Sequence, residues 1–518
     1  MATYQELVAQ ARACVDAGRP QDAEPALRAI VAANPGEHYA WALLGQAALF
    51  RGSPGEAEAH FQAALRGDRK SAQYMNLLGV AFAEQGRADE ALAALRRALR
   101  VRPAFAEAHY NVGKVLYRLG KLPDARDAFR RAAGIDPRYP GARYYLAKTL
   151  TELGEPAAAL GLLEAAQADS PQDEWYPIQC ARALLAMDRD DEAVAVLQAG
   201  AARMPERSMV RRSLATLLLG AGRWKEGWSE YRHRAVIGDR SRPVLPDTLP
   251  EDLSGRMIEV VWEQGLGDVL FFCRWLPALR ARGARVIVLA PPRLAPLLDR
   301  SGWADEVREG SVASAGDWCF AGDLPYVLGA ETPVPPLPLA PLASEAAAWE
   351  ARLAAAGPPP YLAVAWRAGA DLQQGPEMGR NLQVLSKALP AEALGAALRS
   401  WPGTLVSVQR APRADETAAL ARSAGRPALD ASEANEALES VVALLSLMHG
   451  YAGVSSTNVH LMAALGKPGA VVVPFPPEWR WMNHGAASPW FPSMRLLRQR
   501  PGIDWRDNLV SMSGLLPG

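Results

Sequence analysis

Residues 70–103 read KSAQYMNLLGVAFAEQGRADEALAALRRALRVRP, and the same pattern returns in altered form on both sides. Gly79 in this stretch has counterparts at Gly45 and Gly113, which makes the spacing 34 residues. The register continues through Ala147, Ala181 and Ala215. Small residues that recur with one period over so long a stretch indicate a stack of equivalent units rather than one compact core.

Three further series share this period. Turn residues recur at Gly52, Gly86, Gly120, Gly154, Asp188 and Gly222. Alanines recur at Ala23, Ala57, Ala91, Ala125, Ala159 and Ala193, and prolines close units at Pro35, Pro103, Pro137, Pro171 and Pro205. Small residues let two helices approach, glycine turns the chain and proline ends a helix, so each unit is predicted to be a helix pair.

The arrangement resembles the tetratricopeptide repeat, whose Leu-Gly, Ala, Phe and Pro positions are matched by Leu78-Gly79, Ala91, Phe129 and Pro137. This resemblance implies an α solenoid, a tetratricopeptide-repeat superhelix of about seven repeats over residues 1–235. Such arrays hold a protein or peptide partner on their concave face, and the alternative is a purely structural or dimerising scaffold.

One position in the array bears on how a partner would be held. Some repeat-bearing glycosyltransferases line their groove with an asparagine in each unit. Here the equivalent positions are Leu43, Leu77, Asn111, Tyr145, Gln179 and Ser213. The asparagine series is absent, so we expect the partner to be recognised through side chains.

Composition limits the remaining possibilities. Lys+Arg and Asp+Glu both number 56, so the formal net charge of +0 gives no bulk electrostatic reason to bind nucleic acid or an anionic membrane. The four cysteines, Cys14, Cys180, Cys273 and Cys319, are scattered and are expected to be reduced. The sequence has no signal peptide pattern and no apolar run of roughly 20 residues, which predicts a cytoplasmic protein without a membrane span.

Residues 236–255 read as a linker, and residues 256–340 as a first α/β half. Residues 257–262 form a predicted strand, a helix is expected from Val269 to Arg282, and residues 284–290 form the next strand. The loop between strand and helix carries Glu263, Gln264, Gly265, Gly267 and Asp268. Ligands bind at this edge of open parallel sheets, and the absence of a GxGxxG or P-loop motif argues against a dinucleotide or ATP.

Asp268 has two readings. A carboxylate at the head of a helix can act as a general base toward a substrate hydroxyl. The simpler reading is that Asp268 caps the helix.

Residues 341–500 again alternate strand and helix and read as a second doubly wound half, followed by a tail at 501–518. Polar residues follow its strands at Arg367, Arg380, Asn381, Gln409, Arg410, Ser455, Ser456, Thr457, Asn458 and His460. Arginines that converge beside a helix N-terminus suit a diphosphate, although a single arginine more often forms a surface ion pair.

The aromatic residues of two segments also have two readings. Trp224, Trp228 and Tyr231 are expected to cover the end of the array by packing rather than by binding a ligand. In the closing segment, residues 474–492, the aromatic side chains either cover a base or sugar or pin the C-terminal segment onto the first half.

The two halves resemble the heptosyltransferase-like glycosyltransferases of GT-B fold, through Gly265-Leu266-Gly267-Asp268, His460-Leu461 and Gly466-Lys467-Pro468. With the repeats, the chain is similar to bacterial tetratricopeptide-repeat glycosyltransferases, including those implicated in modifying flagellin. The resemblance implies two Rossmann-like halves, Asp268 as the catalytic aspartate of the acceptor side, and a second half that binds the nucleotide sugar. Where that family has an Asp-Thr pair this chain has Ser455-Ser456, which removes a carboxylate contact to the sugar or to a metal.

The sequence therefore predicts a metal-independent glycosyltransferase. It would move a sugar from a nucleotide-activated donor to a Ser or Thr hydroxyl of a protein held by the repeats, with flagellin as one candidate acceptor. No cofactor besides the nucleotide-sugar donor substrate is expected, since no Asp-x-Asp motif lies in the donor segment. The alternatives are a non-catalytic repeat scaffold or chaperone with a degenerate transferase domain, and a lipopolysaccharide-type saccharide transferase.

Overall fold

The computed structural model describes residues 11–14, 17, 19–139, 141–234, 248–310, 317–368, 388–503 and 505–516. The chain divides into two compact units, with the boundary between Pro171 and Gln172. Within the described ranges, no helix is both long and apolar enough to cross a membrane.

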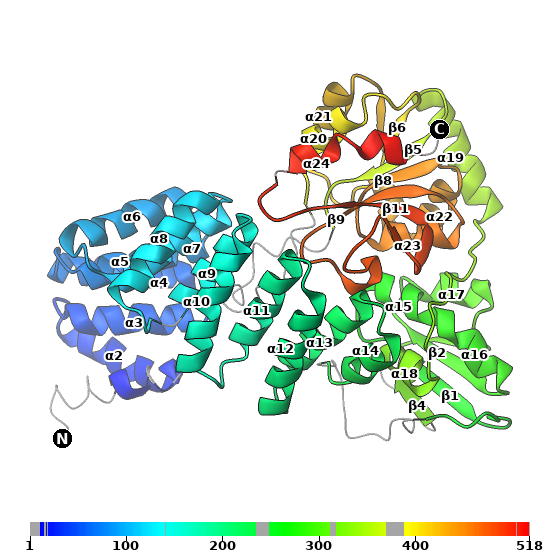
Figure 1. Ribbon diagram of the computed structural model, residues 1–518. Coiled ribbons are helices and arrows are strands. Elements are labelled where there is room, and N and C mark those ends of the chain that lie inside the picture. The colour runs from blue at the N-terminus through cyan, green and yellow to red at the C-terminus, as the bar shows by residue number, and fades with distance from the viewer. Residues whose placement is uncertain are drawn as a thin grey trace. The chain divides into compact units, whose positions relative to one another are not determined.

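The first unit consists of consecutive helix pairs (Figure 1). Its helices are α2 Pro20–Ala33, α3 His38–Phe50, α4 Pro54–Gly67, α5 Ala72–Glu84, α6 Ala88–Val101, α7 Ala106–Arg118, α8 Leu122–Ile135, α9 Ala142–Glu152 and α10 Pro156–Asp169. The pairs α3–α4, α5–α6, α7–α8 and α9–α10 follow the 34-residue period, which confirms the predicted repeats.

Two of the small-residue series have distinct roles in these pairs. Gly86 and Gly120 lie between the two helices of a pair with φ values of 76° and 72°, a left-handed conformation that glycine adopts without strain. Gly113 instead lies inside α7, where a Cβ atom would stand 2.5 Å from the ring of Phe129 on α8. The first series turns the chain, and the second lets the paired helices approach.

The second unit begins with two more helix pairs, α11 Trp175–Ala186 with α12 Asp190–Arg203, and α13 Ser208–Gly220 with α14 Trp224–Tyr231. The C-terminal part of the chain is bonded directly to them. The backbone N–H of Asn483 donates to the carbonyl of Gly220 at 2.8 Å, and its side-chain amide donates to Asp190 at 2.7 Å. The last two repeats therefore belong structurally to the α/β region.

The first α/β half contains a four-stranded parallel sheet in the order β3-β2-β1-β4. Its strands are β1 Met257–Val261, β2 Arg285–Ala290, β3 Glu306–Glu309 and β4 Asp317–Phe320, and its helices are α15 Leu266–Phe272, α16 Leu276–Ala281, α17 Ala295–Ser301 and α18 Leu324–Val327. The single helix predicted from Val269 to Arg282 is interrupted by a 3-10 turn at Cys273–Trp275. Pro277 follows, in the first turn of α16, and it has no N–H group to continue the earlier helix.

The second half contains a seven-stranded sheet in the order β10-β11-β9-β8-β5-β6-β7, parallel except for β10. Its strands are β5 Leu362–Ala365, β6 Leu405–Ser407, β7 Ala428–Asp430, β8 Gly450–Val454, β9 Gly469–Val473, β10 Ala487–Ser488 and β11 Phe491–Arg498. Its helices are α19 Ala343–Ala356, α20 Ala391–Ala397, α21 Glu416–Ala424, α22 Leu438–Ser446, α23 Thr457–Ala464 and α24 Trp505–Leu509.

The C-terminal residues are integrated into this half. β11 pairs with β9 in parallel register, and Leu509 and Met512 are buried in the core that α20 also lines. The segment expected to be a tail thus covers part of the sheet. Taken in order, the chain is a series of helix pairs with a 34-residue period followed by an α/β region with parallel sheets.

We expect Gly113→Ala and Gly161→Ala to change the stability of the first unit in opposite directions. The new methyl group at position 113 would collide with the buried Phe129 ring and cost about 1–3 kcal/mol. Gly161 lies in α10 with no atom within 4 Å of its Cβ position, so alanine there should add roughly 0.5–1 kcal/mol through helix propensity. Hydrogen exchange of the helix amides measures both, and equal effects would contradict the close approach at Gly113.

Candidate functional site

In both sheets the strand order reverses beside the first strand of the half. β1 lies between β2 and β4, and β5 lies between β6 and β8. Open parallel sheets bind ligands at the carboxyl ends of the strands where the order reverses. The loop after β1 leads to Asp268, and the loop after β8 begins with Ser455. The residues that the sequence singled out therefore stand at the two reversal points.

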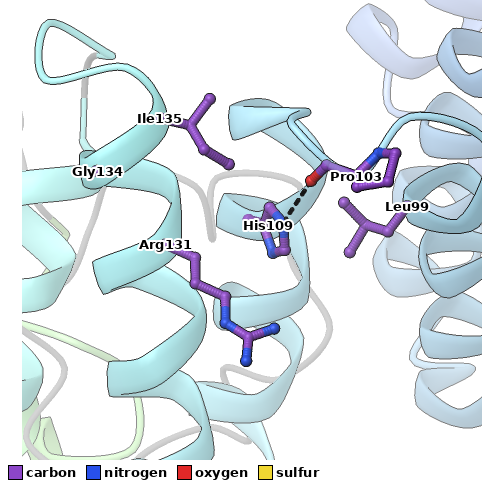
Figure 2. A pocket seen from close by; sticks show the side chains of 6 residues that line it. All are labelled: Leu99, Pro103, His109, Arg131, Gly134 and Ile135. Atoms are coloured by element: carbon purple, nitrogen blue, oxygen red, sulfur yellow. Dashed lines mark hydrogen bonds between the residues drawn. The ribbon is translucent and has the colours of Figure 1, made fainter.

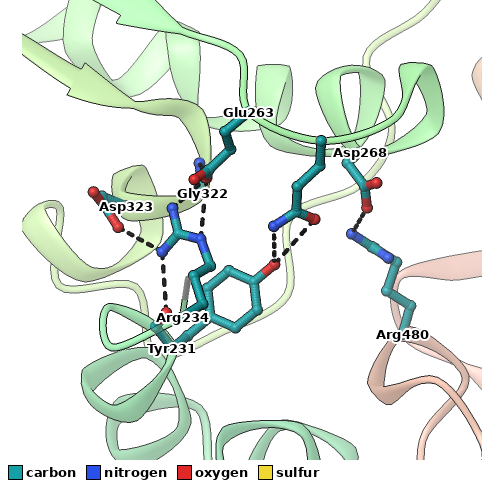
Figure 3. A network of polar contacts seen from close by, with 8 residues as sticks. Tyr231, Arg234, Glu263, Asp268, Gly322, Asp323 and Arg480 are labelled. Atoms are coloured by element: carbon teal, nitrogen blue, oxygen red, sulfur yellow. Dashed lines mark hydrogen bonds and ion pairs between the residues drawn. The ribbon is translucent and has the colours of Figure 1, made fainter. Parts of the chain in front are cut away.

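Asp268 lies where the first half contacts the second. Its Oδ2 accepts the backbone N–H of Gly265 at 3.2 Å. Its Oδ1 accepts a hydrogen bond from Nη2 of Arg480, which Figure 3 shows. Arg480 belongs to the 3-10 turn Trp479–Trp481 in the C-terminal segment. The Asp268 side chain keeps 26% of its exposure. Asp268 thus caps its helix and also contacts the second half.

Arg480 is held in an aromatic environment. It is 8% exposed, and its guanidinium carbon lies 4.7 Å from the ring centre of Phe271 and 4.6 Å from that of Trp479. Burial alone would lower the pKa of Arg480, but the neighbouring Asp268, Tyr231 and Glu478 outweigh it, and the net pKa is raised. Arg480 therefore presents a fixed positive charge to Asp268.

The same loop contacts the start of α23. A Cβ atom on Gly267 would lie 3.1 Å from Cδ2 of His460 and 3.7 Å from Cα of Thr457. The His460 ring stands edge-on against Phe491 with 5.0 Å between ring centres. A side chain at position 267 would separate these groups, so the glycine brings the predicted residues of the two halves together.

Within the stretch Ser455–Asn458, some polar side chains serve the fold. The Ser455 hydroxyl donates to Glu478 at 3.1 Å, and the amide of Asn458 donates to the carbonyl of Val408 at the end of β6, at 3.2 Å. Ser456 precedes α23 as its N-cap and Thr457 opens the helix, and both remain partly exposed. Ser456 and Thr457 are therefore the residues of this stretch that are most accessible to a ligand.

Arg367 and Gln409 connect the ends of β5 and β6. Arg367 forms an ion pair with Glu416 at 2.7 Å and donates to the carbonyl of Ala411 at 3.1 Å. The buried Gln409 accepts the backbone N–H groups of Trp366 and Arg367 at 3.0 and 2.8 Å. Arg367 therefore forms an ion pair, which was the simpler interpretation of a single arginine in the sequence.

The remaining predicted donor-side residues are divided. Arg410 is exposed and, within the described part of the chain, forms no ion pair. Arg380 and Asn381 lie outside the described residues. Thr457 and His460 are thus the donor-side candidates that lie beside Gly267 of the first half.

The predicted acceptor-side loop is anchored by a buried ion-pair network (Figure 3). Arg234, at the end of the repeats, donates through Nε to Glu263 at 3.1 Å and through Nη1 to Asp323 at 2.7 Å. The backbone N–H of Gly322 donates to the same Glu263 oxygen at 3.2 Å. Glu263 therefore connects the last repeat to the first sheet.

Tyr231 lies between this network and Asp268 in Figure 3. Its hydroxyl accepts the side-chain amide of Gln264 at 3.0 Å. Burial raises the pKa of Tyr231, and burial also raises the pKa of Glu263 although Arg234 beside it acts in the opposite direction. Gln264 and Glu263 of the loop thus bind Tyr231 and Arg234, and these contacts set the position of Asp268 on the same loop.

An aromatic cluster supports these groups. Trp228 contacts Trp479 and Trp490 edge-on, at 5.2 and 6.1 Å between ring centres, and Phe271 contacts the same two tryptophans at 5.0 and 5.3 Å. Trp228, Phe271, Trp479 and Trp490 are all buried. The contacts therefore support a packing role, rather than ligand binding, for both aromatic segments.

Three arginines that no motif marked prove to be central. Arg234 and Arg480 bind the two acidic residues of the loop, and Arg274 is buried over the ring of Phe271 at 4.3 Å while donating to the carbonyl of Trp490 at 2.8 Å. Burial, with Arg480 nearby, lowers the pKa of Arg274 to about 9. The polar partners Glu263, Asp268 and Trp490 lie 29, 212 and 216 residues away in the sequence from their arginines, and only the aromatic run around Arg480 hinted at a packed environment.

Neither metal ligands nor a reactive thiol stand out in the described ranges. No group of three or more His, Cys, Asp or Glu side chains is arranged there to hold a metal ion. Cys273 is buried in the cluster behind Asp268, and burial raises its pKa to about 12, so the thiol stays protonated.

The comparisons with known proteins support the repeats. The tetratricopeptide repeat family matches residues 8–74, 44–98 and 76–140 in one form and residues 120–176 and 150–218 in another. The N-terminal region therefore carries tetratricopeptide repeats. The chain is also related to Protein FlbA of Caulobacter vibrioides, with 27% identity over 321 residues. That match covers 56% of this chain and 51% of FlbA, so the chain spans about half the length of this curated relative.

Solved structures with similarity to the chain include PilF of Pseudomonas aeruginosa, at 20% identity and a TM-score of 0.35, covering 38% of this chain and 90% of PilF. A tetratricopeptide repeat protein from Parabacteroides merdae has 20% identity and a TM-score of 0.37, covering 44% of this chain and 91% of that one.

We expect Arg234→Met to destabilise the second unit by about 3–5 kcal/mol, because the buried carboxylates of Glu263 and Asp323 would lose their cation. Without the cation the pKa of Glu263 rises further, so at lower pH the folded state takes up a proton that the unfolded chain does not. The loss should therefore be smaller near about pH 5 than near about pH 8.

Thermal unfolding across that pH range measures this effect. Arg211→Met is the matched control, since Arg211 pairs with Glu230 where both side chains keep over a fifth of their exposure (22% and 23%), and its loss should cost at most about 1 kcal/mol. Equal losses in the two variants, without pH dependence, would contradict the assignment.

Proposed function

We propose that the protein is a glycosyltransferase of GT-B type that transfers a sugar from a nucleotide-activated donor to a protein hydroxyl, with the repeats recruiting the acceptor. The single observation that carries the proposal is the position of Asp268. It stands at the reversal point of one parallel sheet, beside Gly267, which touches the helix start at the reversal point of the other. Two doubly wound halves that meet at their ligand-binding edges are what a transferase between two substrates requires.

Asp268 is the proposed proton acceptor. As the acceptor oxygen forms its bond to the anomeric carbon, the bond from that carbon to the diphosphate breaks and the hydroxyl proton passes to the carboxylate. Gly265 and Arg480 each occupy one oxygen of Asp268, and each oxygen retains a second lone pair for the acceptor. Both contacts also fix the carboxylate orientation.

The start of α23 is the proposed diphosphate site. Ser456 and Thr457 offer hydroxyl donors, and Thr457 and Asn458 in the first turn of the eight-residue helix offer backbone N–H groups. Arg410, exposed at the end of β6, and Arg380 would add positive charge to the leaving diphosphate. Ser455 stands where the resembling family has aspartate, and its bond to Glu478 holds a carboxylate beside the stretch.

The first helices of the repeats offer the proposed acceptor surface. Tyr110 and Tyr117 on α7 are partly exposed, and the Lys114 ammonium on the same helix lies 5.8 Å from the ring centre of Tyr110. Asn111 donates to Asn76 at 2.9 Å, so this asparagine is engaged within the array. These contacts favour recognition of an acceptor protein by aromatic and lysine side chains. Flagellin is one candidate acceptor.

A second candidate function is a non-catalytic repeat scaffold. The ion pair of Arg367 with Glu416 and the bond of Asn458 to Val408 favour it, because both side chains were predicted to bind phosphate and both serve the fold. The two experiments that follow separate this function from glycosyl transfer.

We expect Asp268→Asn to reduce glycosyl transfer by a factor of 100 or more, in the range of about 10²–10⁴ typical of general-base removal. Asparagine keeps one acceptor oxygen but removes the negative charge beside Arg480, so thermal unfolding of the variant is measured in parallel to separate lost turnover from lost stability. The measurement is the intact mass of candidate acceptors incubated with the protein and nucleotide sugars. Asp299→Asn, an exposed carboxylate on α17, is the control and should leave turnover unchanged. Full turnover in the Asp268 variant would remove this residue from the reaction.

We further expect one nucleoside diphosphate to raise the thermal stability of the second unit. At 100 times its dissociation constant, a ligand that binds only the folded state adds about 2.7 kcal/mol. Uridine, guanosine, adenosine, cytidine and thymidine diphosphates are compared by differential scanning fluorimetry, with Thr457→Val as the matched variant that loses a hydroxyl donor. The scaffold function predicts no shift with any of them.

A further inference from the structure

The first unit carries two grooves that the proposed function does not use. One has a volume of about 440 Å³ and lies between α4 and α6, with side chains of α5 also lining it. The other, of about 460 Å³, lies between α6 and α8, with His109 of α7 lining it. Both are therefore on the face formed by the second helices of the repeats, whereas the tyrosines of the proposed acceptor surface lie on the first helices.

The two grooves share equivalent positions of the repeat. Leu65 lines the first and Leu99 the second, and Arg97 lines the first and Arg131 the second. Each pair is one 34-residue repeat apart. Figure 2 shows Leu99 and Ile135 on opposite sides of His109, whose ring nitrogen lies 3.0 Å from the carbonyl of Pro103. The same apolar and basic elements are thus presented twice in succession.

The apolar part of this surface is exposed. Ile135 in the second groove is 39% exposed, and Leu65 in the first groove and its counterpart Leu99 in the second are partly exposed. Phe82 also lines the first groove, but its side chain is buried. Large apolar side chains that stay open to solvent in repeated positions suit a docking partner with apolar side chains of its own.

Four arginines around the grooves have no acidic partner in the described part of the chain. Arg66, Arg69, Arg97 and Arg131 form no ion pair with any residue that the structure describes. Glu90, the acidic residue in the first groove, is already engaged by Arg87 through two hydrogen bonds of 2.6 and 2.5 Å. In a chain of net charge +0, this face therefore keeps uncompensated positive charge.

We propose that the α4–α6 and α6–α8 grooves together bind an acidic, amphipathic segment of a protein partner. Its apolar side chains would enter the two grooves, and its carboxylates would pair with Arg66, Arg97 and Arg131. The apolar lining distinguishes this partner from a nucleic acid, whose phosphates would use the arginines but leave Leu65, Leu99 and Ile135 uncovered. Binding here is separate from the acceptor surface and does not depend on glycosyl transfer.

The test uses the full chain and a fluorescein-labelled peptide of leucine, glutamate and alanine that is amphipathic as a helix. Fluorescence anisotropy should report saturable binding. The charge-reversal variant Arg66→Glu/Arg97→Glu/Arg131→Glu should weaken it at least tenfold, and Ile135→Ser should weaken it severalfold. Lys225→Glu, an exposed site in the second unit, should leave it unchanged.

A second peptide in which serine replaces every leucine separates the apolar contribution from charge. It should lose most of the affinity at unchanged net charge. Equal binding of the two peptides, equal binding of a single-stranded DNA of the same charge, or binding that survives the arginine reversals would each overturn the proposal. So would a native chain that binds no peptide. Far-UV circular dichroism verifies that the variants remain helical.

Discussion

Edge-on contact among four aromatic side chains is the constraint on which the second unit depends. Trp228 comes from the last repeat, Phe271 from the helix after β1, and Trp479 and Trp490 from the C-terminal segment. Aromatic pairs in this geometry add roughly 0.5–1.5 kcal/mol each beyond the area they bury. Three segments that are distant in sequence are thereby fixed at one point, and Asp268 lies three residues before Phe271.

The polar groups near the cluster owe their positions to this packing. Arg480 lies against Phe271 and Trp479 and reaches Asp268, while Arg234 reaches Glu263 on the same loop. Buried guanidinium groups tolerate such sites because they bond in several directions and stack on rings. The loop after β1 therefore has positively charged neighbours on two sides, Arg234 at Glu263 and Arg480 at Asp268.

The repeats, the two α/β halves and the strands β1, β2, β5, β6, β8 and β9 were predictable from sequence because they depend on local periodicity, whereas β3, β4, β7, β10 and β11 were not predicted. Gly86 and Gly113 mark turns and helix contacts through spacing alone, and buried strands such as β8 and β9 stand out as short apolar runs. The bonding partners of Arg367 and Gln409 were not predictable. Both residues lie at strand ends as expected, but Arg367 pairs with Glu416 and Gln409 accepts backbone N–H groups. The sequence pattern locates the residues at strand ends, but tertiary contacts determine which groups their side chains bind.

Arg480 is a residue whose role the sequence pattern did not indicate. Its pairing with Asp268 spans 212 residues, and the sequence contains no periodicity that connects the two. Likewise the boundary between compact units falls inside the array, after Pro171, although the repeat pattern runs on without interruption. Hydrogen bonds of Asn483 to Asp190 and Gly220 join the later repeats to the C-terminal segment, and these bonds leave no trace in the repeat register.

Those bonds also restrict how the array can change in evolution. A repeat inserted between α12 and α14 would carry Asp190 away from Gly220 and break the contacts that both make with Asn483. A repeat gained or lost among α2–α10 disturbs only its neighbours in the stack. Related chains should consequently differ in repeat number toward the N-terminus, while the two helix pairs next to the sheets are inherited as a fixed part of the α/β region.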